Sequence, residues 1–190
     1  CNALLLKNLE LLDTQIKALL AKYDKSKIGV IAATTNSGVE EFETTKNSMH
    51  YELGSPAYFL SQHLGLTGYF ATVSTACSSG IKAFSLARDL LKINIIDSAI
   101  IVCVDSLAKV PVYGFNPLEV LTNKPCNPFS KNRSGMNIGE ASAIFIVEKE
   151  GKGIEILGIG ESSDIYHSTT PDPEGKEGIN AIKFALNETK

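Results

Sequence analysis

The chain has 190 residues, 44% of them hydrophobic and 21% charged, which is the composition of a globular body and not of a disordered or fibrous chain. Its 18 basic and 21 acidic residues give a formal charge of −3 and form no basic stripe, which argues against nucleic-acid binding. The longest apolar runs are far shorter than the ~20 residues of a membrane-spanning helix, and the start shows no signal peptide, so we expect a cytoplasmic protein with no membrane partner.

The first part of the sequence predicts two strands separated by helices. We expect helices over 1–23, 39–48 and 56–64, and strands over 27–33 and 69–73. The helix over 56–64 has clear end signals, because Ser55 can serve as N-cap, Pro56 suits the first helical position and Gly65 suits the C-terminal stop. This order of elements is typical of a layered α/β protein.

The second part continues the alternation. We expect helices over 77–92, 114–121 and 175–187, and strands over 99–104, 141–147 and 153–160. The helix over 77–92 is apolar around much of its circumference, which predicts a central position. Only 148–152 separates the last two strands, and this short connection predicts an antiparallel hairpin. The sequence therefore predicts an α/β layered fold with a mixed sheet.

Four cysteines are candidates for chemistry. Cys1, Cys77, Cys103 and Cys126 lie too far apart for a Cys-x-x-Cys pair and have no clustered histidines, which argues against a metal site or a disulfide framework. Cys103 lies inside an apolar strand-like run, where we expect a buried and inert thiol. Cys77 differs from the other three, because a predicted strand stops and a predicted helix starts there.

The setting of Cys77 favours a reactive thiol. Unpaired N–H groups and the positive end of the helix dipole at a helix N-terminus stabilise a thiolate. The small residues Ala76 and Ser78 to Gly80 leave room for a sharp turn and for an approaching acyl group, as in a nucleophile elbow. Ser-Ser-Gly stretches also cap ordinary helices, so a structural role remains the alternative at this point.

Three blocks resemble signatures of the β-ketoacyl-(acyl carrier protein) synthases of the elongating type. Residues 74–80 (Ser-Thr-Ala-Cys-Ser-Ser-Gly) resemble the nucleophile motif, and 127–143 (Asn-Pro-Phe-Ser-Lys-Asn-Arg-Ser-Gly-Met-Asn-Ile-Gly-Glu-Ala-Ser-Ala) resemble the Pro-Phe-Asp-x-x-Arg-x-Gly block. Residues 158–171 (Gly-Ile-Gly-Glu-Ser-Ser-Asp-Ile-Tyr-His-Ser-Thr-Thr-Pro) are similar to the Asp-Ala-Tyr-His-x-Thr loop. The chain departs from the family pattern at Ser130, where Asp is usual, and at Ala141 and Ala143, where Gly is usual. The sequence of these blocks is most similar to that of the aryl-polyene branch of the family.

The resemblance implies a thiolase-like layered α/β fold with a mixed sheet. It assigns 1–150 to the N-terminal, nucleophile-bearing domain with the opening strand missing, and 151–190 to the beginning of a C-terminal domain. The first residue is not Met, which fits a processed or trimmed chain. In the family two histidines and a lysine of the second half complete the catalytic set, so we expect the 190 residues alone to be incomplete for condensation.

The resemblance also implies a reaction. Cys77 would accept an acyl group from a carrier-protein thioester, and decarboxylated malonyl-acyl carrier protein would then attack it to give a 3-oxoacyl thioester. The expected partners are acyl carrier protein and a second copy of the chain, in a dimer that extends the sheet through the strand over 99–104. No cofactor is implied beyond the phosphopantetheine that carries the substrates.

Four further residues receive roles from the resemblance. Phe115 matches an aromatic at the acyl pocket, with a core aromatic as the equal alternative. Glu140 would support the centre of the fold near the site. His167 would gate the mouth of the site on a loop that Asp164 anchors, with a satisfied surface histidine as the alternative. His50 and His63 do not match the catalytic histidines.

Two other functions compete with the condensing enzyme. One is a non-catalytic partner subunit like the chain-length factors, against which Cys77 argues, because such partners generally lack the nucleophile. The other is a thiolase, against which the Pro-Phe block argues.

Overall fold

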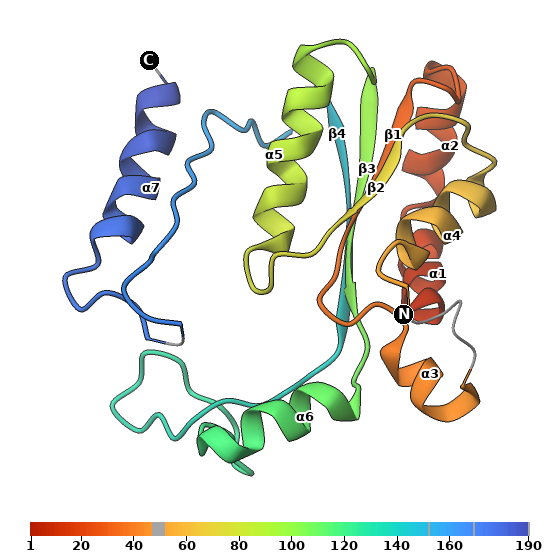
Figure 1. The fold of residues 1–190 in the computed structure, drawn as a ribbon. Helices are drawn as coiled ribbons and strands as arrows, with labels where there is room; N and C mark the ends of the chain where they lie inside the picture. Colours follow the sequence, from red (N-terminus) through yellow and green to blue (C-terminus); the bar gives the residue numbers. More distant parts are fainter. Residues whose placement is uncertain (47–51, 152, 169, 190) are drawn as a thin grey trace. The chain divides into compact units, whose positions relative to one another are not determined.

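One mixed sheet organises the first part of the chain, in a computed structural model that describes residues 1–46, 52–151, 153–168 and 170–189 (Figure 1). The strands are β1 (Ile28–Ala33), β2 (Phe70–Val73), β3 (Ser98–Asp105) and β4 (Ala141–Glu148), in the order β2-β1-β3-β4. β1 pairs in parallel with β2 and β3, whereas β3 pairs antiparallel with β4. The prediction of an α/β fold with a mixed sheet is confirmed.

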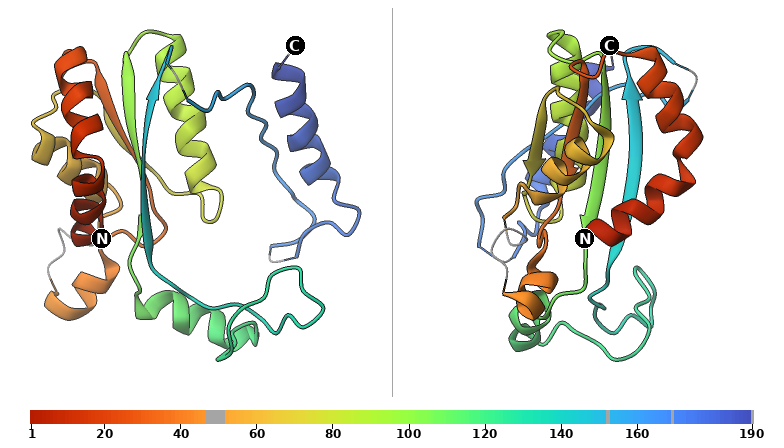
Figure 2. Two further views of the ribbon diagram at one scale, coloured as in Figure 1. Left: turned by 180° about the vertical axis from the view of Figure 1, so that it is seen from behind. Right: turned by 90° about the vertical axis from the view of Figure 1, so that its right-hand side faces the viewer.

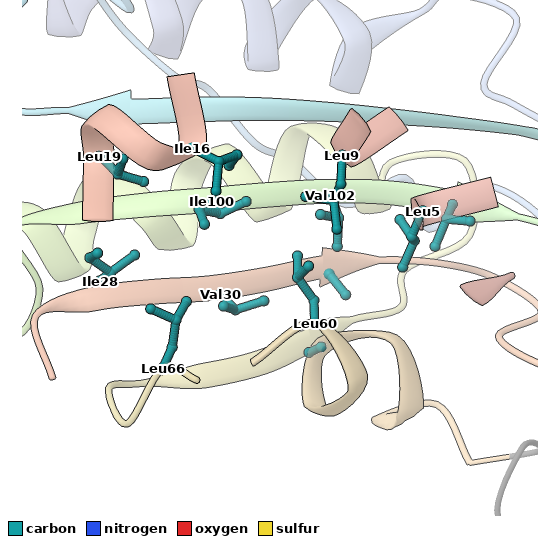
Figure 3. Packing of buried hydrophobic residues seen from close by; sticks show 13 residues of the cluster. Leu5, Leu9, Ile16, Leu19, Ile28, Val30, Leu60, Leu66, Ile100 and Val102 are labelled. Atoms are coloured by element: carbon teal, nitrogen blue, oxygen red, sulfur yellow. The ribbon is translucent and has the colours of Figure 1, made fainter. Parts of the chain in front are cut away.

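Helices cover both faces of this sheet (Figures 1 and 2). α1 (Asn2–Leu11), α2 (Asp13–Lys22) and α4 (Ser55–Leu64) cover one face, and α5 (Ser79–Lys92) covers the other. Side chains along each inner strand alternate between the two faces. Ile28, Val30 and Ala32 of β1 belong to the core under α1, α2 and α4, whereas Ile31 and Ala33 belong to the core under α5. Figure 3 shows how Ile100 and Val102 of β3 extend the first of these cores.

The predicted opening helix is in fact two helices. Leu12 ends α1 and precedes α2 with φ −108° and ψ 14°, and its N–H bonds to the carbonyl of Leu9 at 3.0 Å, three residues back. This local tightening lets the two helices meet at an angle (Figure 2). Leu5 and Leu9 of α1 and Ile16 and Leu19 of α2 can then all be buried against the sheet.

Helix starts differ from the predicted ones at two places. α4 begins at Ser55 with Gly54 as its N-cap, so the prediction that Ser55 caps this helix is wrong, while Gly65 ends it in the left-handed conformation (φ 63°) as predicted. α5 begins at Ser79 and not at Cys77. Nor is α5 fully enclosed within the described residues, because Ile81 is 62% exposed.

The two short helices near the sheet also depart from prediction. α3 (Val39–Thr45) is shorter than the predicted 39–48, whose last two positions lie outside the described residues together with His50. The predicted helix over 114–121 is replaced by α6 (Lys109–Phe115) and the short 3₁₀ helix η2 (Asn116–Leu118). Pro117 has no backbone N–H, so it cannot continue the hydrogen bonding of α6.

The strand over 99–104 does not offer an open sheet edge. β3 is paired on one side with β1 and on the other with β4, so the expectation that it extends the sheet across a dimer is wrong. Within the described residues, β2 and β4 are the outer strands of this sheet.

The chain divides into two compact units, Cys1–Lys149 and Glu150–Lys190. In the second unit, α7 (Lys176–Glu188) agrees with the helix predicted over 175–187. The strand predicted over 153–160 is not formed in those described residues, so the predicted hairpin is wrong. The segment instead lies against α7, where a Cβ on Gly158 or Gly160 would collide with the carbonyl oxygens of Ala185 or Ala181.

Candidate active site

The site lies where several strands of the sheet end. Ala33 of β1 pairs with Val73 of β2 and with Cys103 of β3, so the carboxyl ends of these three parallel strands meet at one edge. The antiparallel β4 starts at the same edge, because Ala141 pairs with Asp105. Turns that follow parallel strands at such an edge form the usual ligand crevice of α/β proteins.

Cys77 lies in the turn between β2 and α5. Ala76, which precedes it, has a positive φ of 52°, a backbone conformation that residues other than glycine rarely adopt. Two serine hydroxyls hold the turn: Ser79 Oγ donates to Ala76 O at 2.6 Å and accepts from Thr75 N at 2.9 Å, while Ser78 Oγ donates to Thr75 O at 2.8 Å. The chain therefore turns sharply before the cysteine and leaves Cys77 exposed, two residues before the helix.

A cavity of about 460 Å³ opens beside Cys77. Its walls come from the turn after β1, the Cys77 turn, the end of β3 and the start of β4. The lining residues are Ala33, Thr34, Thr35, Ala76, Cys77, Ser79, Gly80, Cys103, Val104, Asp105, Gly139, Glu140, Ala141, Ser142 and Ala143. Most of these side chains are small, so the cavity can admit a bound group next to the thiol.

Asp105 holds one wall of this cavity. Its Oδ1 accepts hydrogen bonds from Thr34 Oγ1 at 2.7 Å, Thr35 N at 2.9 Å and Asn36 N at 2.8 Å. Its Oδ2 accepts from Thr35 Oγ1 at 2.9 Å and from Thr35 N at 3.1 Å. Thr34 Oγ1 in turn accepts from Ser37 N at 2.8 Å. The carboxylate therefore ties the end of β3 to the turn after β1.

A second thiol lines the same cavity. Cys103 is half-buried, and its Sγ lies 3.7 Å from the position that a Cβ on Gly80 would take. Burial raises the pKa of the Cys103 thiol, and the negative charge of Asp105 raises it further. Cys103 is therefore disfavoured as a thiolate. The prediction that this thiol is buried is wrong, because it is half-buried and lines the cavity, and its inertness stays a prediction.

Glu140 also lines the cavity, and its Oε2 accepts a hydrogen bond from Leu107 N at 3.2 Å. It thereby joins the segment before β4 to the segment after β3.

Phe115 ends α6 and is not among the residues that line the cavity. Glu43 fixes the start of that helix, because its carboxylate accepts from Lys109 N at 3.0 Å. The supporting role of Glu140 and the acyl-pocket role of Phe115 stay predictions.

Asp164 and His167 belong to the second unit. Asp164 accepts hydrogen bonds from Asp172 N at 2.8 Å and from Tyr166 N at 2.9 Å, so one carboxylate ties together two points of the loop. These bonds lower the pKa of Asp164, the bond from Asp172 most strongly. His167 is exposed on this loop, and its gating role stays a prediction. His63 lies at the end of α4, where its ring stacks on Phe59.

We expect the Asp164 loop to loosen only at low pH. Because the folded-state pKa is lowered, the stabilisation by the carboxylate is complete above the ordinary pKa of an aspartate and is lost as the pH falls through the lowered value. Hydrogen exchange at the amides of Tyr166 and Asp172 measures this. Asp164→Asn should speed that exchange at neutral pH, where the wild-type carboxylate is ionised, whereas Asp97→Asn, in the other unit, should not. Protection that stays the same in Asp164→Asn would contradict this account.

The sequence singled out Cys77, which lines the cavity and whose role as nucleophile stays a prediction, but it did not point to Asp105 and the two threonines that it binds. A signal was present, because Thr34 and Thr35 follow one predicted parallel strand and Asp105 closely follows another. Polar residues at such strand ends share one edge of a sheet.

Comparison with known proteins gives a consistent family. Residues 13–152 match the family model described as β-ketoacyl synthase, N-terminal domain. A protein of Schizosaccharomyces pombe assigned as a mitochondrial 3-oxoacyl-[acyl-carrier-protein] synthase is 32% identical over 155 residues, which cover 72% of this chain and 36% of that protein. The 3-oxoacyl-[acyl-carrier-protein] synthase 2 of Mycobacterium leprae is 29% identical over 150 residues, which cover 70% of this chain and 36% of that protein.

Solved structures share the fold. A chain from the complex of the ketosynthase ApeO with its chain length factor ApeC, from Xenorhabdus doucetiae, matches 98% of this chain with a TM-score of 0.89 and 35% identity, and the match covers 50% of that chain. A β-ketoacyl synthase from Burkholderia phymatum matches 90% of this chain with a TM-score of 0.76 and 21% identity, over 49% of its own length. The chain thus spans about a third of the length of the curated relatives and about half of the length of the structural ones.

In the part of the chain that the structure describes, no helix has the length and apolar character needed to cross a membrane.

Proposed function

Because the chain belongs to the β-ketoacyl synthase family, we propose that it takes part in the decarboxylating condensation that builds 3-oxoacyl-acyl carrier protein, with Cys77 as the acyl acceptor. The observation that carries the proposal is the exposed thiol in a sharply turned segment beside a cavity at the carboxyl edge of the sheet. The pathway would be fatty acid or polyene and polyketide synthesis, and the resemblance to the aryl-polyene branch favours a polyene.

The proposed chemistry has two stages. The Cys77 thiolate attacks the carbonyl carbon of an acyl thioester, the bond to the carrier thiol breaks, and the acyl group remains on Cys77. Loss of carbon dioxide from a malonyl thioester then gives a carbanion, which attacks the acyl carbonyl and expels the Cys77 thiolate. In this proposal backbone N–H groups at the start of α5, which begins two residues after Cys77, stabilise the developing negative charge.

The partner in this proposal is acyl carrier protein, whose phosphopantetheine arm delivers both substrates, and the protein acts in the cytoplasm without a further cofactor. Support comes from the relatives, two of which are named 3-oxoacyl-[acyl-carrier-protein] synthases. The alternative is a non-catalytic subunit like a chain length factor, and one of the matching structures is a complex that contains such a factor. The presence of Cys77 favours the enzyme, because such subunits generally lack the nucleophile.

Selective alkylation tests the proposal. In the folded intact protein we expect Cys77 to react faster with iodoacetamide than any other cysteine, because it is exposed whereas Cys103 and Cys126 are half-buried and the pKa of Cys103 is raised. Peptide mapping by mass spectrometry gives the order of reaction. Faster labelling of Cys103 or Cys126 under native conditions would remove Cys77 as the nucleophile.

We also propose that the intact protein is a two-fold dimer that pairs through β2. β2 is an outer strand of the sheet, and aromatic side chains are exposed beside it: Phe70 is 46% and Tyr58 51% exposed, with their rings 6.0 Å apart. An outer strand with an exposed apolar surface is a template for pairing with a second chain.

Sedimentation of the intact protein tests the dimer. We expect a dimer at micromolar concentration and a shift toward monomer in Phe70→Lys, because charge on an edge strand opposes pairing. Leu11→Lys is the matched control, since Leu11 is 79% exposed on α1 and away from β2. A wild-type monomer, or equal effects of the two variants, would reject β2 as the interface.

A further inference from the structure

The Asp105 carboxylate makes hydrogen bonds that reach beyond its own strand. Thr34, Thr35 and Asn36 all donate to it, at distances between 2.7 and 3.1 Å. These donors are three consecutive residues in the turn after β1, whereas Asp105 ends β3. A single side chain therefore fixes the whole turn relative to the neighbouring strand.

The turn that Asp105 holds is part of the Cys77 cavity. Thr34, Thr35 and Asp105 line this cavity together with Cys77. The turn continues into Ser37, which is buried, has a positive φ of 48° and donates its N–H to Thr34 Oγ1. Such a conformation persists only when its surroundings enforce it, and the hydrogen bonds of Asp105 and Thr34 supply that constraint.

We propose that Asp105 is a positioning residue that keeps Thr34 and Thr35 as a fixed wall of the Cys77 cavity and so limits the size of the group that reaches the Cys77 thiol. The inference rests on the proposed role of Cys77 as acyl acceptor. It assigns Asp105 to specificity and not to proton transfer, because both carboxylate oxygens already accept hydrogen bonds from the turn.

Aspartate suits this task better than its amide. An ionised carboxylate presents acceptors only, and the backbone N–H groups of Thr35 and Asn36, which can only donate, reach both of its oxygens. In Asp105→Asn the amide NH₂ would replace one oxygen and would face a backbone N–H group, so the wall would lose part of its support. The overall shape of the side chain would change little.

The test compares a small and a bulky thiol reagent on the intact protein. Second-order rates of Cys77 modification by iodoacetamide and by N-phenylmaleimide give a bulky-to-small ratio for each variant. In Asp105→Asn we expect this ratio to rise by roughly tenfold, because a wall free to move by a fraction of an ångström no longer excludes the larger reagent. Asp13→Asn, on α2, carries the same substitution outside the cavity and should keep the wild-type ratio.

Two variants of Thr35 separate positioning from general destabilisation. Thr35→Ser keeps the hydroxyl that donates to Asp105 and loses only a methyl group of the wall, whereas Thr35→Val keeps the size of the side chain and loses the hydroxyl. If hydrogen bonding to Asp105 holds the wall, the ratio should rise more in Thr35→Val than in Thr35→Ser. Thr35 is exposed, so its valine variant remains informative if Asp105→Asn fails to fold.

The outcomes are decisive in either direction. An unchanged ratio in folded Asp105→Asn, or equal ratios in the two Thr35 variants, would overturn the inference. The alkylation ratio needs no acyl transfer, so failure of the proposed function would show separately, as Cys77 that is alkylated but forms no acyl-enzyme with a thioester.

Discussion

Cys77→Ser should reduce acyl transfer by the intact protein by roughly 10⁴- to 10⁶-fold, the range seen when a nucleophile is removed from a site that works as a unit. Serine nearly preserves the size of the side chain, but a hydroxyl is a far weaker nucleophile than a thiolate at neutral pH. The measurement is the rate at which a labelled acyl group moves from a carrier-protein thioester to the protein and on to a 3-oxoacyl product.

The other cysteines provide the controls. Cys103→Ser and Cys126→Ser should transfer acyl groups at rates near that of the wild type, since neither thiol is placed as the nucleophile. Transfer by Cys77→Ser at the wild-type rate would show that the acyl group attaches elsewhere, whereas no transfer by the wild-type protein would favour the partner subunit. Loss of transfer in Cys103→Ser alone would identify Cys103, and not Cys77, as the acyl acceptor.

Ile100→Ala should lower the free energy of unfolding by about 2–5 kcal/mol. Ile100 is fully buried in the middle of β3, which is paired on both sides, and its side chain packs into the core under α1, α2 and α4. A rigid sheet strand cannot move to fill the space that the lost methyl groups leave, so the cost includes a cavity as well as lost burial. Urea unfolding followed by circular dichroism measures the change.

Ile81→Ala is the matched control for that experiment. It removes the same atoms from a side chain that is 62% exposed on α5, and alanine has the higher helix propensity. We expect a change within about 0.5 kcal/mol. Similar losses at both positions would mean that Ile81 is buried in the intact protein, for instance beneath a segment or subunit beyond these residues.

The sequence best predicted the strands that are buried on both faces of the sheet. β1 and β3 are apolar on both faces because helices cover both, so their continuous apolar runs were sufficient evidence. The segment 153–160 also carries apolar residues, yet it forms no strand, and Ile154, Ile156 and Leu157 are exposed. A strand also needs a partner for its backbone, and the local sequence does not show whether that partner is present.

The residues of the candidate site also differ in how well the sequence predicts them. Cys77 could be identified because its motif is local, with the turn residues and the helix start adjacent in sequence. Asp105 was missed, although its place at a strand end was a signal, because its hydrogen bonds join it to Thr34 and Thr35, about 70 positions earlier, through the parallel register that brings Ala33 beside Cys103. The helix start was misplaced by two residues since the left-handed Ala76 and the Ser78 cap add a turn that the apolar periodicity does not reveal.

The order of strands in the sheet has a consequence for synthesis on the ribosome. Of the four described strands β1 is made before the others but occupies an inner position, and the register pairs Ile28 with Ser98, which is made 70 residues later. Until β3 has left the exit tunnel, one side of β1 has no strand to bond with, and β3 itself waits for β4. The nascent chain therefore carries unpaired apolar strands for most of the time that this region takes to translate, which makes it a substrate for chaperones that hold such segments apart.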